Sequence, residues 1–86
     1  MNFKISQHAK DEIQRRNIPL NLLLSVLNNP QQIVSEKNHR KAYQSKVEFE
    51  AGKTFLLRAI VADDNEPAVV VTAYRTHKIN KYWKSL

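Results

Sequence analysis

Four side chains of this 86-residue sequence could take part in proton transfer or bind phosphate: His8, Arg58, Arg75 and Tyr82. Arg58 interrupts the apolar run TFLLRAIV, and Arg75 ends the run AVVVTAYR. Arginine stays charged and can bond two phosphate oxygens at once, whereas histidine and tyrosine can exchange protons. Such groups suit the cleavage of RNA without a metal, because RNA supplies its own nucleophile, the 2'-hydroxyl. The sequence does not indicate which group would be the base and which the acid.

Two of these residues also have purely structural interpretations. A buried arginine is costly without a partner, so Arg58 could pair with a carboxylate at the core edge or extend its head to solvent. His8 could be an ordinary surface residue. Glu12 follows it by one helical turn and could orient the imidazole or raise its pKa.

The closing segment is strongly cationic. Residues 75–86 hold four lysines and arginines and no acid. In a helix, Arg75, Lys78 and Tyr82 would share one face, while Ile79 and Trp83 would form an apolar face. This pattern fits a phosphate-binding helix, and it also fits a solvated helix that is only anchored by its apolar side.

The charge balance of the whole chain favours a polyanionic partner. The formal net charge is +6, which in a domain of this size is typical of nucleic-acid binding, and we expect RNA. Candidate substrate-binding residues are Arg40, Lys41, Lys46, Thr76, Lys78 and Lys81.

The composition excludes several other classes of site. Without cysteine, the chain can form neither a disulfide nor a thiolate zinc site, and one glycine cannot build a glycine-rich phosphate loop. The three histidines lack metal-ligand spacing, so we expect no metal and no cofactor. No apolar run reaches the roughly 20 residues of a membrane helix, and the N-terminus lacks the core of a signal peptide. We expect a cytoplasmic protein.

The hydrophobic pattern predicts eight elements. Period-two alternation indicates strands and helical spacing indicates helices, with Ser6 capping the first helix, Pro19 opening the second and Thr76 capping the last. The predicted strands are 3–5, 32–36, 42–50, 54–61 and 68–75, and the predicted helices are 7–17, 18–28 and 76–86.

The order β-α-α-β-β-β-β-α predicts a single α+β domain over residues 1–86. Two N-terminal helices should pack on one face of a small, mainly antiparallel sheet, and a short helix should close the chain. Within the strand 54–61, Phe55, Leu57, Ala59 and Val61 share one face, which leaves Arg58 on the other. A substrate would lie on that other face.

The segments SQHAKDEIQRRNI, LLSVLNNPQQIV and VVTAYRTHKINKYW resemble a family of small bacterial domains of unknown function. That family opens with an S-x-HA helix, continues with an NP motif and closes with YRT.KI.KY, so the resemblance covers nearly the whole chain. The family is similar to the RelE/ParE and BrnT-like toxins. The resemblance implies a RelE/ParE-like fold and a metal-independent endoribonuclease, the toxin of a toxin–antitoxin pair. It also implies an antitoxin partner and RNA, free or on the ribosome, as substrate.

The resemblance also implies roles for particular residues. RelE-like ribonucleases place an arginine in a central strand and another at the end of the last strand, which Arg58 and Arg75 match. Tyr82 resembles their tyrosine two helical turns later, and the histidine of the HA motif is His8. Two other functions stay open: a nucleic-acid-binding module without catalysis, and a protein-directed toxin of the gyrase type or an inactive relative.

Overall fold

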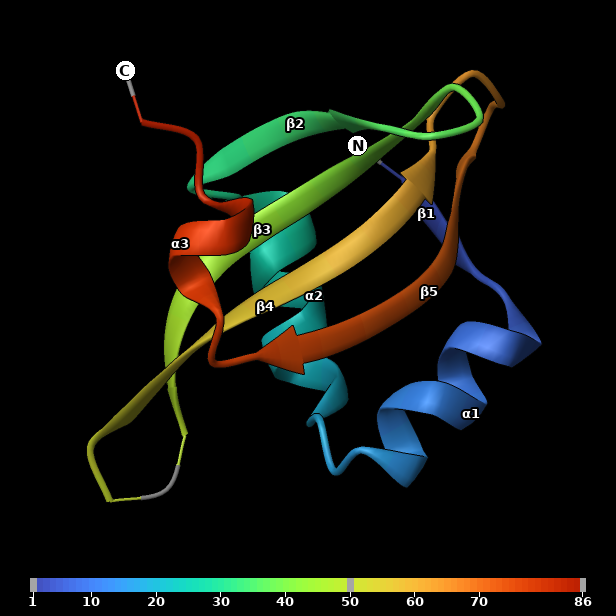
Figure 1. Ribbon diagram of the computed structural model, residues 1–86. Helices are drawn as coiled ribbons and strands as arrows, with labels where there is room; N and C mark the ends of the chain where they lie inside the picture. Colours follow the sequence, from blue (N-terminus) through green and yellow to red (C-terminus); the bar gives the residue numbers. More distant parts are fainter. Residues whose placement is uncertain (1, 50, 86) are drawn as a thin grey trace.

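The computed structural model describes residues 2–49 and 51–85, in the predicted order of elements (Figure 1). Glu50 and Leu86, the predicted last residues of a strand and of the closing helix, lie outside the described residues. The elements are β1 (Phe3–Ile5), α1 (Gln7–Arg15), α2 (Leu20–Asn28), β2 (Gln32–Glu36), β3 (Arg40–Phe49), β4 (Lys53–Ala62), β5 (Ala68–Thr76) and α3 (Ile79–Tyr82).

The five strands form one mixed sheet in the order β1-β5-β4-β3-β2. The strands β2 to β5 pair in sequence as antiparallel neighbours, whereas the short β1 pairs with β5 in parallel. The parallel pair joins strands that are far apart in the sequence, because the chain passes through both helices and three strands before it returns beside β1. The expectation of a mainly antiparallel sheet is confirmed.

The helices α1 and α2 cover one face of the sheet, which we call the helix face. The Ser6 hydroxyl caps α1 by accepting a hydrogen bond from the amide of Ala9 (3.0 Å), as its residue type predicts. Ala9 and Ile13 are buried in one core cluster with Leu57, Ala59 and Val61, which share one face of β4. This core holds the sheet in place from one side only.

The helix α3 lies against the other face, which we call the α3 face; Figure 1 shows α2 behind the sheet and α3 in front of it. The prediction of a helix that starts at Thr76 is wrong, because Thr76 still pairs with Leu56 in the ladder between β4 and β5. Lys78 is the N-cap residue instead. The Thr76 hydroxyl accepts a hydrogen bond from the amide of Lys78 (3.1 Å), so it shapes the turn before the helix.

Candidate active site on the α3 face

Arg58 is the centre of a hydrogen-bonded cluster on the α3 face. Its side chain is 2% exposed, and three nitrogens donate: Nε to Gln44 Oε1 (2.8 Å), one terminal nitrogen to Tyr74 Oη (2.6 Å), and the other to Glu36 Oε2 (2.8 Å). The ring of Tyr82 lies over the guanidinium, 4.2 Å from its central carbon. The structure therefore contains the ion pair with a carboxylate that was the structural interpretation of Arg58.

The electrostatics of this cluster keep the arginine charged. Burial acts to lower the pKa of Arg58, but the hydrogen bonds with Glu36 and Tyr74 outweigh it and the pKa is raised. Burial raises the pKa of Tyr74 in turn, although the neighbouring guanidinium acts against this. At neutral pH, Tyr74 is therefore a phenol. Its oxygen accepts from Arg58, and a hydrogen bond with the neighbouring Tyr82 also raises the pKa of Tyr74.

Three members of the cluster are not among the candidate site residues predicted from the sequence. Glu36, Gln44 and Tyr74 come from three different strands, and Gln44 and Tyr74 are the register partners of Arg58 on β3 and β5. Only a strand alignment places them beside Arg58. A glutamine between Tyr43 and Ser45 carries no local signal of a buried role, yet the residue is 0% exposed.

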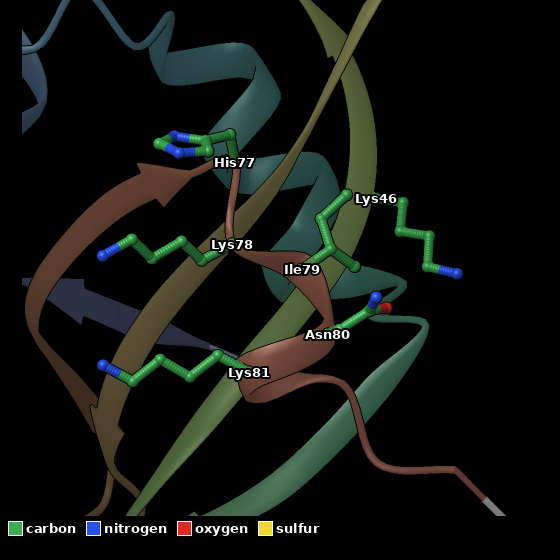
Figure 2. A pocket seen from close by; sticks show the side chains of 6 residues that line it. All are labelled: Lys46, His77, Lys78, Ile79, Asn80 and Lys81. Atoms are coloured by element: carbon green, nitrogen blue, oxygen red, sulfur yellow. The ribbon is translucent and has the colours of Figure 1, made fainter.

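A cationic rim lies next to the cluster. Four cationic or titratable side chains, together with Ile79 and Asn80, line a hollow of about 570 Å³ around α3 (Figure 2); the four are Lys46, His77, Lys78 and Lys81. Lys78 and Lys81 extend to one side of α3, and Lys46 lies on the other side. The ammonium of Lys46 also lies 4.1 Å from the centre of the Trp83 ring.

Arg75 does not join Arg58. Tyr74 is the register partner of Arg58, so Arg75, the next residue, projects from the opposite face of the sheet. There its guanidinium lies over the rings of Phe49 (4.5 Å) and Phe55 (5.3 Å). The interpretation that groups Arg75 with Lys78 and Tyr82 on one helical face is wrong, because Arg75 belongs to a strand.

His8 and Lys41 also lie away from the α3 face. His8 is 66% exposed on α1, which packs against β5 on the helix face, and its Nε2 is 3.8 Å from Glu12 Oε1. Lys41 is the register partner of the core residue Val61 and pairs with Asp63 at 3.2 Å. His8 does not contribute to the surface around Arg58. Lys41 projects from the helix face, but it lines the hollow at the turn between β2 and β3 that Glu36 also lines.

Arg40 borders the cluster at its other end. It is the register partner of Glu36 and lines a hollow of about 620 Å³ at the turn between β2 and β3. Glu36 also lines this hollow while it bonds to Arg58. The α3 face thus collects seven of the ten candidate residues: Arg40, Lys46, Arg58, Thr76, Lys78, Lys81 and Tyr82. The three that it leaves out are His8, Lys41 and Arg75.

The described residues hold neither a cluster of metal ligands nor a helix that could span a membrane. Residues 2–49 and 51–85 contain no group of three histidine, aspartate or glutamate side chains placed to hold a metal ion. In the same part of the chain, no helix has the length and apolar character needed to cross a bilayer.

Comparison with known proteins gives one match. Residues 5–75 match the model of a family described as a domain of unknown function, DUF4258. No curated protein and no solved structure matches the chain. The matched segment runs from the end of β1 to Arg75 in β5, so it includes Glu36, Gln44, Arg58 and Tyr74. The chain belongs to the DUF4258 family.

Proposed function

We propose that the protein is an endoribonuclease that cleaves RNA through its 2'-hydroxyl, with its active site on the α3 face. One observation carries the proposal: a carboxylate, a guanidinium and a phenol lie in direct contact, in Glu36, Arg58 and Tyr74. This reaction needs a base, a cation that stabilises the phosphorane and an acid for the leaving oxygen. The three side chains supply one group for each task.

The roles follow from the chemistry of each group. The Glu36 carboxylate takes the proton of the 2'-hydroxyl, whose oxygen attacks phosphorus. Arg58 holds the non-bridging oxygens as their charge grows, and its two terminal nitrogens suit a forked contact. The bond from phosphorus to the 5'-oxygen breaks, and Tyr74 donates its proton to that oxygen. The products are a 2',3'-cyclic phosphate and a free 5'-hydroxyl.

The cationic rim would bind the flanking phosphates. Lys46, Lys78 and Lys81 lie on the face that carries Arg58, and Arg40 lies beyond Glu36. A strand of RNA that crosses the cluster would meet cations on both sides of the scissile phosphate. Base-edge contacts are not required for this binding, so we expect relaxed sequence specificity.

The resemblance of the sequence motifs to a family similar to the RelE/ParE and BrnT-like toxins supports the same proposal. It adds that the protein would act as the toxin of a toxin–antitoxin system and would be held inactive by an antitoxin. The groups proposed here differ from the four expected from the sequence, because Glu36 and Tyr74 replace His8 and Arg75. Tyr82 covers the arginine and has no proton-transfer role in this proposal.

The test is incubation of the purified protein with mixed-sequence RNA in EDTA, alone and with ribosomes. We expect wild-type cleavage to give cyclic phosphate ends and DNA of the same sequence to stay intact. Glu36→Gln keeps a hydrogen-bond acceptor for Arg58 but removes the base, and should slow cleavage on the order of 100-fold or more. Glu48→Gln is the matched control, because Glu48 is an exposed acid of β3 on the same face of the sheet as Glu36, and this variant should cleave as wild type does. Equal rates for Glu36→Gln and Glu48→Gln would contradict the proposed role of Glu36.

A second function, a nucleic-acid-binding module without catalysis, is favoured by one observation. All three guanidinium nitrogens of Arg58 already donate hydrogen bonds, and Tyr82 covers the group. A phosphate can therefore reach Arg58 only if the Tyr82 ring moves. If RNA binds in EDTA without cleavage, and the affinity falls steeply with salt, this second function replaces the first.

A further inference from the structure

Gln44 lies at the junction of the arginine cluster and the C-terminal segment. Its Oε1 accepts from Arg58 Nε (2.8 Å), and its Nε2 donates to Gln32 Oε1 (2.8 Å) and to the carbonyl of Tyr82 (3.2 Å). A guanidinium can only donate and a carbonyl can only accept, so the neighbours fix which way the amide points. The residue is 0% exposed, so water does not substitute for these partners.

Gln32 extends this network to the end of the chain. It is the register partner of Gln44 on the edge strand β2. Its Oε1 accepts from the amide of Lys84 (3.2 Å), and its Nε2 donates to the carbonyl of Lys84 (2.6 Å). The two glutamines together bind the main chain of residues 82–84 at three atoms.

Up to Ser85, the last residue that the structure describes, few other interactions hold the C-terminal segment in place. Within Ile79–Tyr82 none of the residues is buried, and the helix has only four residues. Lys46 contacts the Trp83 ring, and Tyr82 contacts Arg58 and Tyr74. The position of Tyr82 over the guanidinium thus depends on the hydrogen bonds that the glutamines make.

We propose that Gln44 is a positioning residue of this site: it orients the Arg58 guanidinium and, with Gln32, docks residues 82–84 so that Tyr82 covers it. The effect that we expect on the cleavage rate rests on the proposed function. Only an amide fits all three partners of Gln44, since a carboxylate would set a second acceptor against the Tyr82 carbonyl. An apolar side chain would leave Arg58 Nε buried without an acceptor.

The first test measures position without activity. Trp83 is the only tryptophan, so its fluorescence reports where the C-terminal segment lies. Gln32→Ala and Gln44→Glu each remove contacts to residues 82–84 and should shift the Trp83 emission to longer wavelength. Gln44→Met also loses the bond to the Tyr82 carbonyl, and in addition it should speed the exchange of the Arg58 Nε–H proton with water in NMR spectra. Gln7→Met, at an exposed position of α1, is the matched control and should change neither signal.

The second test separates binding from rate. Because the lysines of the rim supply affinity, Gln44→Met should leave the Kd for a 2'-deoxy RNA analogue unchanged. It should lower the cleavage rate at saturating RNA on the order of 10 to 100-fold, since the guanidinium loses its orientation. Gln44→Glu keeps an acceptor for Arg58 Nε, so it should recover part of that rate. If Gln44 had only a structural role, Gln44→Met and Gln44→Glu would cleave equally slowly when folded to the same extent.

The outcomes distinguish this proposal from the proposed function. Absence of cleavage by the wild type would defeat the ribonuclease proposal, while the Trp83 and Arg58 signals would still decide the role of the glutamines. Unchanged Trp83 emission in both Gln32→Ala and Gln44→Glu would overturn the inference, whether or not the wild type cleaves RNA. If the variants of Gln44 do not fold, Gln32→Ala decides, because Gln32 lies on the edge strand and is partly exposed.

Discussion

Replacing Glu36 by alanine measures how strongly the folded state depends on the partner of Arg58. Removal of one member of a buried ion pair costs about 3–5 kcal/mol, because the remaining charge has lost its compensation. The Glu36 side chain is 32% exposed, so water can approach Arg58 from the vacated side. Gln44 and Tyr74 also keep their bonds to the guanidinium. We therefore expect a loss of about 2 kcal/mol, the range of one charge-assisted hydrogen bond.

The assay is urea unfolding followed by circular dichroism, with thermal unfolding beside it. For a domain of this size, about 2 kcal/mol corresponds to a fall in Tm of roughly 8–16 °C. Glu36→Gln retains an acceptor but loses the charge and should cost about half as much. Glu48→Ala, an exposed acid on the same strand face as Gln44 and Lys46, should stay within about 0.5 kcal/mol of wild type.

The comparison between the two acids decides the result. If Glu36→Ala and Glu48→Ala lose the same free energy within about 0.5 kcal/mol, the carboxylate does not compensate Arg58 and the reasoning is refuted. A more stable Glu36→Ala variant would refute it too, since the pair would then cost more in desolvation than it returns.

Three further perturbations test other parts of the molecule. Leu23→Ala empties a fully buried position in α2 and should cost about 3 kcal/mol in urea unfolding, whereas Leu24→Ala, 39% exposed, should cost under about 1 kcal/mol. The hydrogen bond from Arg15 is the main cause that lowers the pKa of Glu12 below 4.5, and the nearby positive charges add to it. The ionised Glu12 therefore stabilises the folded state fully above pH 4.5, and this contribution is lost as the pH falls through the folded-state pKa. The stability gap between wild type and Glu12→Gln should therefore shrink on acidification below that value. Burial raises the pKa of Tyr74 above 10.0, so in an absorbance titration Tyr74→Phe should lose part of the tyrosinate signal that appears at the highest pH.

The fold was largely predictable from local patterns. The strands Phe3–Ile5 and Gln32–Glu36 have the predicted bounds, and Ser6 caps α1 as expected. Period two places Arg58 correctly on the face opposite to Leu57, because alternation is a property of the strand itself. The failure concerns the end of the chain, where a β-ladder extends through Thr76 and shortens the last helix.

The site was less predictable because its residues meet through register and not through spacing. Arg58 and Arg75 both occur in apolar runs that read as strands, and the sequence alone gives them similar weight. The pairing of Arg58 with Tyr74 decides that they lie on opposite faces. The same pairing brings in Gln44, which has no local pattern at all. A one-residue shift of β5 would have placed Arg75 on the α3 face beside Arg58 and Tyr74 on the helix face.

The two arginines also differ in the energetic cost of their burial. Arg75 lies at the partly exposed end of its strand, where contact with two phenylalanine rings is favourable and little desolvation is needed. Arg58 is 2% exposed, and burial of an ion pair generally stabilises a fold less than an apolar side chain of similar volume would. A chain of 86 residues has a small stability margin. Stability therefore explains poorly why Arg58 is buried with partners from three strands and under a tyrosine ring. The arrangement is well explained if these partners keep the guanidinium oriented for an anion that displaces the Tyr82 ring.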